Sequence, residues 1–186
     1  SLQFYDAQGV AIHKIVARPT TNLQALDALT EFFKDQDQSP GIQVSSPEPR
    51  PAEVTDTEIN AEEFRSAWAA MTDTHEFFGL LKKFKVSRTQ GLRLSDPRFV
   101  KAMHPSTPTR LLELAAAKSV PIMVFVGNPG MIQIHTGPVQ KIMEMGPWIN
   151  VMDPGFNLHL RQDLVSHCWV VRKPTPDGIV TTIEIS

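Results

Sequence analysis

The sequence predicts an α+β fold in which a helical segment precedes an antiparallel sheet of six or more strands. Between residues 60 and 119, apolar residues recur at helical spacing behind residues that commonly cap helices. From residue 121 the pattern changes to short β-rich runs separated by tight turns such as NPG and DPG. Because helices and strands occupy separate parts of the chain, the architecture expected is α+β.

The first 38 residues predict a β-hairpin followed by one helix. Two short apolar runs flank a turn that ends at Gly9, and residues 22–34 carry apolar residues at helical spacing behind Asn22. Such a piece buries too little apolar surface to fold alone. Four prolines then predict an extended linker over residues 39–56, which leaves residues 57–186 as the main domain.

Three capping boxes introduce the helices expected in the main domain. They pair Asn60 with Glu63, Asp73 with Glu76, and Ser87 with Gln90. The helix after Asp73 has an apolar stripe that should face the core, formed by Phe77, Leu80, Leu81 and Phe84. A fourth helix is expected to begin at Thr107-Pro108, because proline is tolerated in a first helical turn.

The strand-rich region contains six β-type runs, IMVFVG, MIQIHTG, WINVM, FNLHLR, SHCWVVR and GIVTTIEI. In residues 156–161 apolar and polar residues alternate, which predicts one buried and one polar face. Regular spacing and tight turns favour an antiparallel meander of these runs.

Composition excludes several classes of protein. The 186 residues carry a net charge of −2 and are 41% apolar, which excludes a chain disordered throughout and gives no reason to expect a nucleic-acid partner. No apolar run reaches the roughly 18 residues that span a bilayer, so no membrane insertion is expected. The sequence shows no secretory leader and one cysteine, Cys168, which together favour a reducing cytoplasm.

No common zinc or nucleotide motif is present. The six histidines lack the spacings of zinc sites, and no glycine-rich phosphate-binding motif occurs. The segment Gly127–Gly130 is better explained as a turn than as a phosphate cradle, and Cys168 as a structural residue within a strand.

His75 is the histidine most suggestive of a ligand. At about 100° per residue it points away from the core stripe, with Phe78 and Gly79 on its own side. We place it at the second helical position, where the helix dipole keeps the ring neutral, as metal ligation requires. The alternative is an ordinary solvent-exposed histidine.

Basic residues nearby can be explained in two ways. Arg88 belongs to a group that also contains Lys82, Lys83, Lys85 and Arg93, and Lys173 ends a later strand. These cations are either an ordinary solvated surface or a clamp for ligand carboxylates. With a neutral imidazole and the apolar wall of Phe78, the second interpretation describes a haem site with anchored propionates.

Four blocks resemble the HemS/ChuS/HmuS family of bacterial cytoplasmic haem-utilisation proteins, also called hemin-degrading factors. They are TDTHEFFGLLKKFKVSRTQGLRL, IMVFVGNPGMIQIHTGPVQKI, GPWINVMDPGFNLHL and WVVRKPTPDGIVTTIEI, in the family's order and spacing over residues 57–185. The opening SLQFYDAQGVAIHKI is similar to the end of the family's first repeat. The resemblance implies a HemS-like C-terminal repeat after the tail of a first repeat at residues 1–38.

The resemblance also implies roles for individual residues. His75 in TDTHEFF matches the axial ligand of the haem iron, and Arg88 and Lys173 match basic residues near the propionates. Phe125 in MVFVGN matches an apolar residue against the porphyrin. The implied cofactor is haem (iron protoporphyrin IX), and the implied partners are a haem uptake transporter or a downstream haem oxygenase.

The departures from the family pattern leave the class of function open. The distal arginine of the first repeat and the closing segment of the second repeat are missing, so the chain is expected to be a fragment. Haem degradation in the full-length parent, a pure haem carrier and a non-binding scaffold all remain alternatives, with little turnover expected from this fragment. The unpaired hairpin at residues 2–16 favours self-association by strand exchange.

Overall fold

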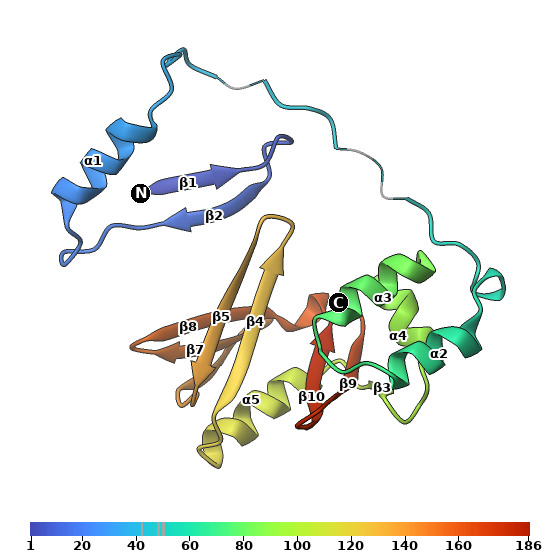
Figure 1. Ribbon diagram of the computed structural model, residues 1–186. Coiled ribbons are helices and arrows are strands. Elements are labelled where there is room, and N and C mark those ends of the chain that lie inside the picture. Colours follow the sequence, from blue (N-terminus) through green and yellow to red (C-terminus); the bar gives the residue numbers. More distant parts are fainter. Residues whose placement is uncertain (42, 48, 50) are drawn as a thin grey trace. The chain divides into compact units, whose positions relative to one another are not determined.

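The computed structural model describes residues 1–41, 43–47, 49 and 51–186 and confirms the α+β class (Figure 1). The described residues form two compact units. The first comprises Ser1–Arg50 with Val124–His135, and the second comprises Pro51–Met123 with Thr136–Ser186. The predicted linker over residues 39–56 includes Ile42, Glu48 and Arg50, which lie outside the described residues.

The first unit contains the predicted N-terminal hairpin. Strands β1 (Leu2–Tyr5) and β2 (Ala11–Ile15) pair antiparallel. Gly9, in the turn between them, has a φ of +78°, a conformation that glycine adopts without strain. Helix α1 (Leu23–Phe33) begins behind Asn22, whose side-chain oxygen accepts from the Ala25 backbone N–H at 3.0 Å.

A second hairpin belongs largely to the same unit. Strands β4 (Ile122–Asn128) and β5 (Met131–Gly137) form a two-stranded sheet. The Asn128 side chain accepts from the backbone N–H groups of Gly130 and Met131, which confirms the predicted turn. Its amide also donates to the backbone oxygen of Ile12 at 2.7 Å, so the turn is tied to β2.

The second unit opens with a short 3₁₀ turn, η1 (Asp56–Glu58), and three helices. These are α2 (Ala61–Ala69), α3 (Glu76–Phe84) and α4 (Arg88–Leu94). Asn60 and Ser87 accept the capping hydrogen bonds expected at the starts of α2 and α4, at 3.1 and 3.0 Å. Local sequence therefore determines where these two helices begin.

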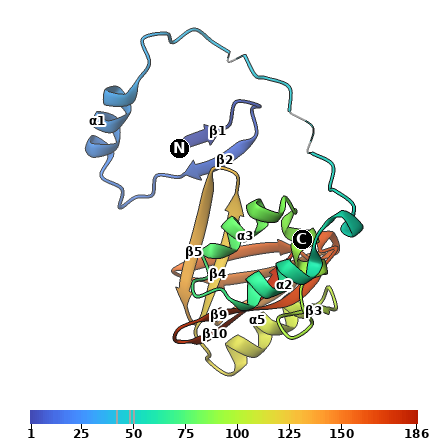
Figure 2. The ribbon, with the colours of Figure 1, turned by 45° about the vertical axis from the view of Figure 1, so that its right-hand side comes forward.

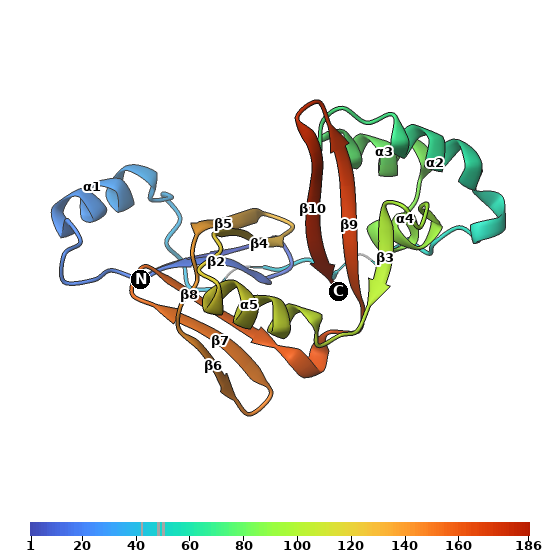
Figure 3. The same ribbon diagram turned by 90° about the horizontal axis from the view of Figure 1, so that it is seen from below.

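The three helices pack against a three-stranded antiparallel sheet (Figure 3). Its order is β10 (Gly178–Ile185), β9 (Cys168–Thr175), β3 (Val100–Met103). Trp68 is fully buried between the layers, and its Nε1–H donates to the backbone oxygen of Arg172 on β9 at 3.0 Å. The remaining buried apolar residues of this core are Phe64, Met71, Phe77, Leu80, Leu81, Val86, Leu92, Leu94, Val100, Trp169 and Val171.

Gly91 is required by close packing between α4 and α3. A Cβ at this position would lie 2.6 Å from Leu81 Cδ2 and 3.3 Å from the ring of Phe64. Both neighbours are buried, so they have little room to move. The glycine lets α4 approach the aromatic core and thereby sets where Arg88, at the start of the same helix, can lie.

Helix α5 (Thr107–Ala117), labelled in Figure 2, contributes Leu112 and Ala115 to a second core. There, β6 (Ile142–Met145), β7 (Trp148–Asp153) and β8 (Phe156–Arg161) form an antiparallel sheet, followed by the 3₁₀ turn η2 (Gln162–Leu164). Its buried members are Leu112, Ala115, Val139, Ile149 and Val151. Phe156, Leu158 and Leu160 pack against them, so the predicted apolar face of residues 156–161 is confirmed.

Two sequence expectations need correction. Residues 60–119, expected to be helical, include strand β3, and among the described residues the later strands are divided over separate small sheets instead of one continuous meander. Residues 100–103 form a strand because β3 pairs with β9, and in this pairing Val100 lies opposite Val171. This pairing joins segments about 70 residues apart, which a local pattern cannot reveal.

Candidate functional site

The imidazole of His75 lies at the start of α3 and is almost fully in solvent. Its side chain is 91% exposed, which confirms that it points away from the core. It occupies the cap position directly before Glu76, two positions earlier than the second helical position expected, so the predicted cap at Asp73 is wrong. Residues 73–76 instead form a turn before the helix, in which the Glu76 N–H donates to the Asp73 backbone oxygen at 3.1 Å. The Glu76 carboxylate accepts from the backbone N–H and hydroxyl of Thr72 at 3.1 and 3.0 Å.

Asp73 holds the His75 ring in place. Its Oδ1 accepts from the His75 backbone N–H and lies 2.7 Å from the ring Nδ1. These two hydrogen bonds from His75, the backbone one being the larger effect, lower the pKa of the Asp73 carboxyl below its ordinary value. An ionised carboxylate only accepts hydrogen bonds, so Nδ1 carries the hydrogen and a neutral ring presents its lone pair on Nε2.

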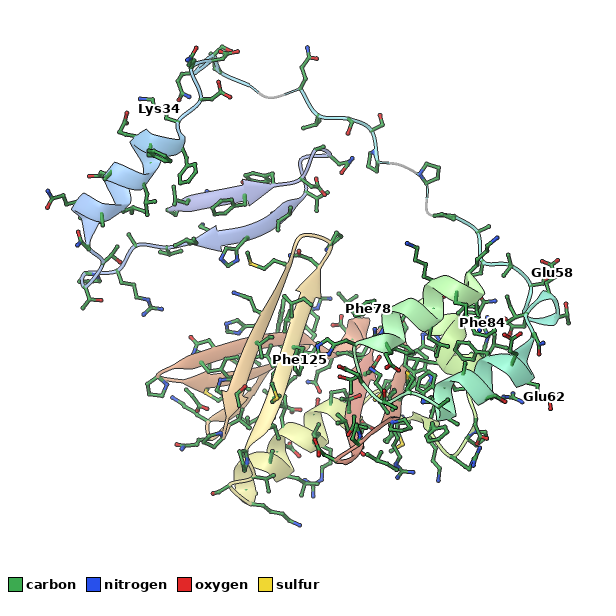
Figure 4. The ribbon with its side chains drawn as sticks, in the orientation of Figure 1. Lys34, Glu58, Glu62, Phe78, Phe84 and Phe125 are labelled. Atoms are coloured by element: carbon green, nitrogen blue, oxygen red, sulfur yellow. The ribbon has the colours of Figure 1, made fainter. Side chains whose placement is uncertain are left out.

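The surface one turn beyond His75 is apolar and open. Phe78 is 67% exposed on α3, where Figure 4 labels it. A Cβ added at Gly79 would meet nothing within 4 Å. Residues three apart on a helix are neighbours, so Phe78 lies beside His75 on an unobstructed surface.

Arg88 and Lys173 meet at a single carboxylate. Arg88 Nε, from α4, donates to Glu184 Oε2 at 2.7 Å, and Lys173 Nζ, from β9, donates to Glu184 Oε1 at 3.2 Å. The side chains of Lys173 and Glu184 are 10% and 13% exposed, whereas that of Arg88 is 43% exposed. The structure thus brings together the two cations that the sequence proposed as a pair.

Burial and charge act in opposite directions on these groups. Burial by itself would raise the pKa of Glu184, but the hydrogen bond from Arg88 and the charges of both cations outweigh it, so that pKa is lowered. Burial lowers the pKa of Lys173, and the attraction of Glu184 offsets this effect only in part. Glu184 and Lys173 are therefore an ion pair in a position that is largely shielded from solvent.

Aromatic rings connect this charged cluster to the surface around His75. Lys173 Nζ lies 4.4 Å and the Arg88 guanidinium 4.9 Å from the centre of the buried Phe77 ring. The same guanidinium lies 5.8 Å from the centre of Phe78. These distances are within the range of cation–π contacts. His75, Phe78 and Arg88 therefore follow one another along one side of the helical layer.

Sequence reasoning missed Glu184. Val180, Thr182 and Glu184 occupy every second position of β10 and therefore share one face of the sheet. Glu184 lies opposite Trp169 in the register with β9. It is the acidic residue in the run GIVTTIEI, an otherwise apolar and threonine-rich strand, and that was the available signal. The sequence alone cannot show that Glu184 and Lys173 share a face of the sheet, because this follows only from the β9–β10 register.

The other predicted residue, Phe125, belongs to the first unit. It lies on β4 with 55% of its surface exposed, where Figure 4 labels it. Two of the other basic residues, Lys83 and Arg93, form ion pairs outside this cluster. Arg93, for example, binds Asp56 and Glu53 and, through its hydrogen bonds, lowers the pKa of Asp56 to about 2.

In the described part of the chain, no three His, Cys, Asp or Glu side chains come together as a metal site. His159 Nδ1 lies 2.7 Å from the Asn150 side-chain oxygen, within the sheet. Cys168 is buried, and this burial raises the pKa of its thiol.

In the same described residues, none of the helices has the length and apolar character to cross a membrane.

The family comparison places the chain among haem-related proteins. Residues 85–185 match the model described as the haemin-degrading HemS/ChuX domain. The whole chain is 38% identical to the hemin transport protein HemS of Yersinia enterocolitica and covers 53% of that protein.

Solved structures agree with the sequence match. Holo-PhuS, a heme-binding protein from Pseudomonas aeruginosa, superposes on 99% of the chain with a TM-score of 0.95 and 41% identity, and 53% of PhuS is covered. The heme-degrading enzyme ChuS from Escherichia coli O157:H7 matches 98% of the chain with a TM-score of 0.87 and 36% identity, over 52% of its own length. The chain thus spans about half the length of these relatives.

Proposed function

Because this chain belongs to the haemin-degrading HemS/ChuX domain family, we propose that it binds haem and serves bacterial haem utilisation and iron acquisition in the cytoplasm. The relatives are a hemin transport protein, a heme-binding protein and a heme-degrading enzyme. What they share in these descriptions is the haem group. The proposal for this chain accordingly starts from binding.

The observation that carries the proposal is the exposed, oriented imidazole of His75. Bound haem would supply an iron atom with an axial position open to a nitrogen ligand. The hydrogen bond from Nδ1–H to Asp73 leaves Nε2 as the ligating atom and makes the ring a stronger donor. The 91% exposure of the side chain leaves room for a large flat group to approach.

The neighbouring residues fit the rest of the haem group. Phe78 offers an exposed apolar ring beside His75, and Gly79 adds no side chain that would block a macrocycle. Arg88 and Lys173 supply two cations suited to propionate groups. Phe125, an exposed side chain of β4, is kept as a proposed apolar contact of the porphyrin on the strength of the family resemblance.

The test of this function is the spectrum of the haem complex with His75 replaced. The His75→Ala variant should lose the Soret and charge-transfer signature of a histidine-bound iron, because the proposed ligand atom is gone. His159→Ala is the matched control, since His159 is held by Asn150 within a sheet. Haem titration followed by absorbance measures both variants against the unmodified chain.

The opposite pattern would contradict the assignment. If His159→Ala abolishes the signature and His75→Ala keeps it, the iron ligand is not His75. A chain whose Soret band is the same with and without His75 would show that haem binds elsewhere or non-specifically.

The carrier form of the proposal needs haem binding alone, whereas the relatives include both a heme-binding protein and a heme-degrading enzyme. On this proposal the chain exchanges haem with an uptake transporter or a downstream haem oxygenase. Stoichiometric carbon monoxide release with a reductant and catalase present would assign degradation to this chain instead.

A further inference from the structure

Glu184 occupies the position where a carboxylate would bind the two cations. Its Oε1 accepts from Lys173 Nζ and its Oε2 from Arg88 Nε, at 3.2 and 2.7 Å. Its side chain is only 13% exposed, so water shields it poorly from its neighbours. In effect, the protein places one of its own carboxylates in the clamp that was predicted for a ligand.

The charge balance of this cluster leaves it incompletely neutralised. Arg88 and Lys173 contribute two positive charges and Glu184 one negative charge, which gives a formal net charge of +1. Within the described residues, both Nη groups of Arg88 lack a protein hydrogen-bond partner, and the Arg88 side chain is 43% exposed. A guanidinium has five donors, so a second carboxylate can still bind its outer edge.

The inner side of the cluster is closed by the Phe77 ring, which is 1% exposed and lies 4.4 Å from Lys173 Nζ and 4.9 Å from the Arg88 guanidinium. A second carboxylate must therefore approach from the outer side and remain close to Glu184. Two like charges separated by about 6 Å at an effective dielectric constant near 20 repel one another appreciably.

We propose that Glu184 is an internal counter-anion that weakens the binding of ligand carboxylates to Arg88 and Lys173. This proposal rests on the proposed haem-binding function and names the residue that sets affinity at the same site. The ligand carboxylate binds the free edge of Arg88 and is repelled by Glu184 across the shared cations. Haem is then held less tightly than two unpaired cations would hold it, and is more easily released.

The experiment compares variants of Glu184 with two ligands, haem and haem dimethyl ester. Glu184→Gln and Glu184→Met remove the charge at similar volume, whereas Glu184→Asp keeps it. Both neutral variants should bind haem roughly tenfold more tightly than the unmodified chain, as expected for removal of one nearby like charge. Glu184→Asp should remain close to the unmodified chain. The ester, which has no carboxylates, should bind all of them equally.

Glu113→Gln is the matched control, because Glu113 forms an exposed ion pair with Arg110 on α5. It should leave both affinities unchanged. Ester binding also reports whether each variant keeps a folded site, since it needs His75 and the apolar contacts but not the cations.

Three outcomes would overturn the inference. The first is that both neutral variants bind haem more weakly than, or as tightly as, the unmodified chain. The second is that they gain as much affinity for the ester as for haem. The third is that Glu184→Asp also binds haem more tightly. Failure of the proposed function looks different, because the unmodified chain would then show no His75-dependent haem spectrum at all.

Discussion

One carboxylate oxygen of Asp73 accepts both from the backbone and from the ring of His75, at 2.7 Å each. Such a double contact fixes the ring orientation and selects which nitrogen is free. At the residue scale, this means that the proposed ligand is positioned before any haem binds. A freely rotating surface histidine would have to lose side-chain entropy on ligation, which weakens binding.

Asp73 is therefore expected to act as a positioning residue. Asp73→Ala should weaken haem binding about tenfold to a hundredfold, the usual range for loss of a partner that orients a metal ligand. The reduction potential of the bound iron should shift as well, because a ring without its carboxylate partner is a weaker donor. Haem titration and redox potentiometry measure these two effects.

Asp163→Ala provides the control for Asp73, because Asp163 bonds Arg161 two residues away in a comparable exposed pair. It should change neither affinity nor potential. An Asp73→Ala chain with normal affinity and an unshifted potential would show that the carboxylate does not orient the ligand.

At the scale of elements, Glu184 joins three parts of the second unit. It lies on β10 and binds Arg88 of α4 and Lys173 of β9, so one side chain connects the helical layer to the sheet. The Trp68 hydrogen bond to the backbone of β9 makes a second, uncharged connection between the same layers. Only the first connection depends on pH.

The stability of this junction should fall in acid. The pKa of Glu184 is lowered in the folded chain, so its contribution is complete above its ordinary value of 4.5 and is lost as pH falls through the folded value. The loss should be at most about 1.5–3 kcal/mol, because Arg88 is partly screened by solvent. Urea unfolding between neutral pH and pH 3 measures it.

The Glu184→Gln variant isolates this effect from the other carboxylates. Its unfolding free energy should be lower at pH 7 and should change less between pH 5 and pH 3 than that of the unmodified chain. Parallel pH profiles for the two proteins would mean that Glu184 does not contribute to the acid response.

At the scale of the whole molecule, the first unit leaves much apolar surface uncovered. Helix α1 buries none of its residues, and Phe32 and Phe33 are 80% and 76% exposed. Within the described residues, the hairpin β1–β2 pairs with no other strand. Exposed strand edges and apolar side chains favour pairing with another chain.

The chain is accordingly expected to self-associate through this hairpin at tens of micromolar concentration. Sedimentation velocity should show a dimer or a larger species that dissociates on dilution. The double variant Phe4→Lys, Ile15→Lys should shift the distribution towards monomer, because both side chains are about half exposed and charges there oppose pairing. Strand exchange would be contradicted if the unmodified chain sediments as a monomer, or if the double variant associates as strongly as the unmodified chain.

The sequence by itself determined the local features of this protein. Caps and periodicity located α1, α2 and α4, and the angular position of His75 on its helix predicted its exposure. These features depend on residues a few positions apart, whose interactions are set by helix and turn geometry. The tertiary structure alone decided that β3 pairs with β9 and that Glu184 joins Arg88 and Lys173. Glu184 lies 96 residues from Arg88 in sequence, and their meeting depends on strand register and on the packing of α4 at Gly91, which no local pattern encodes.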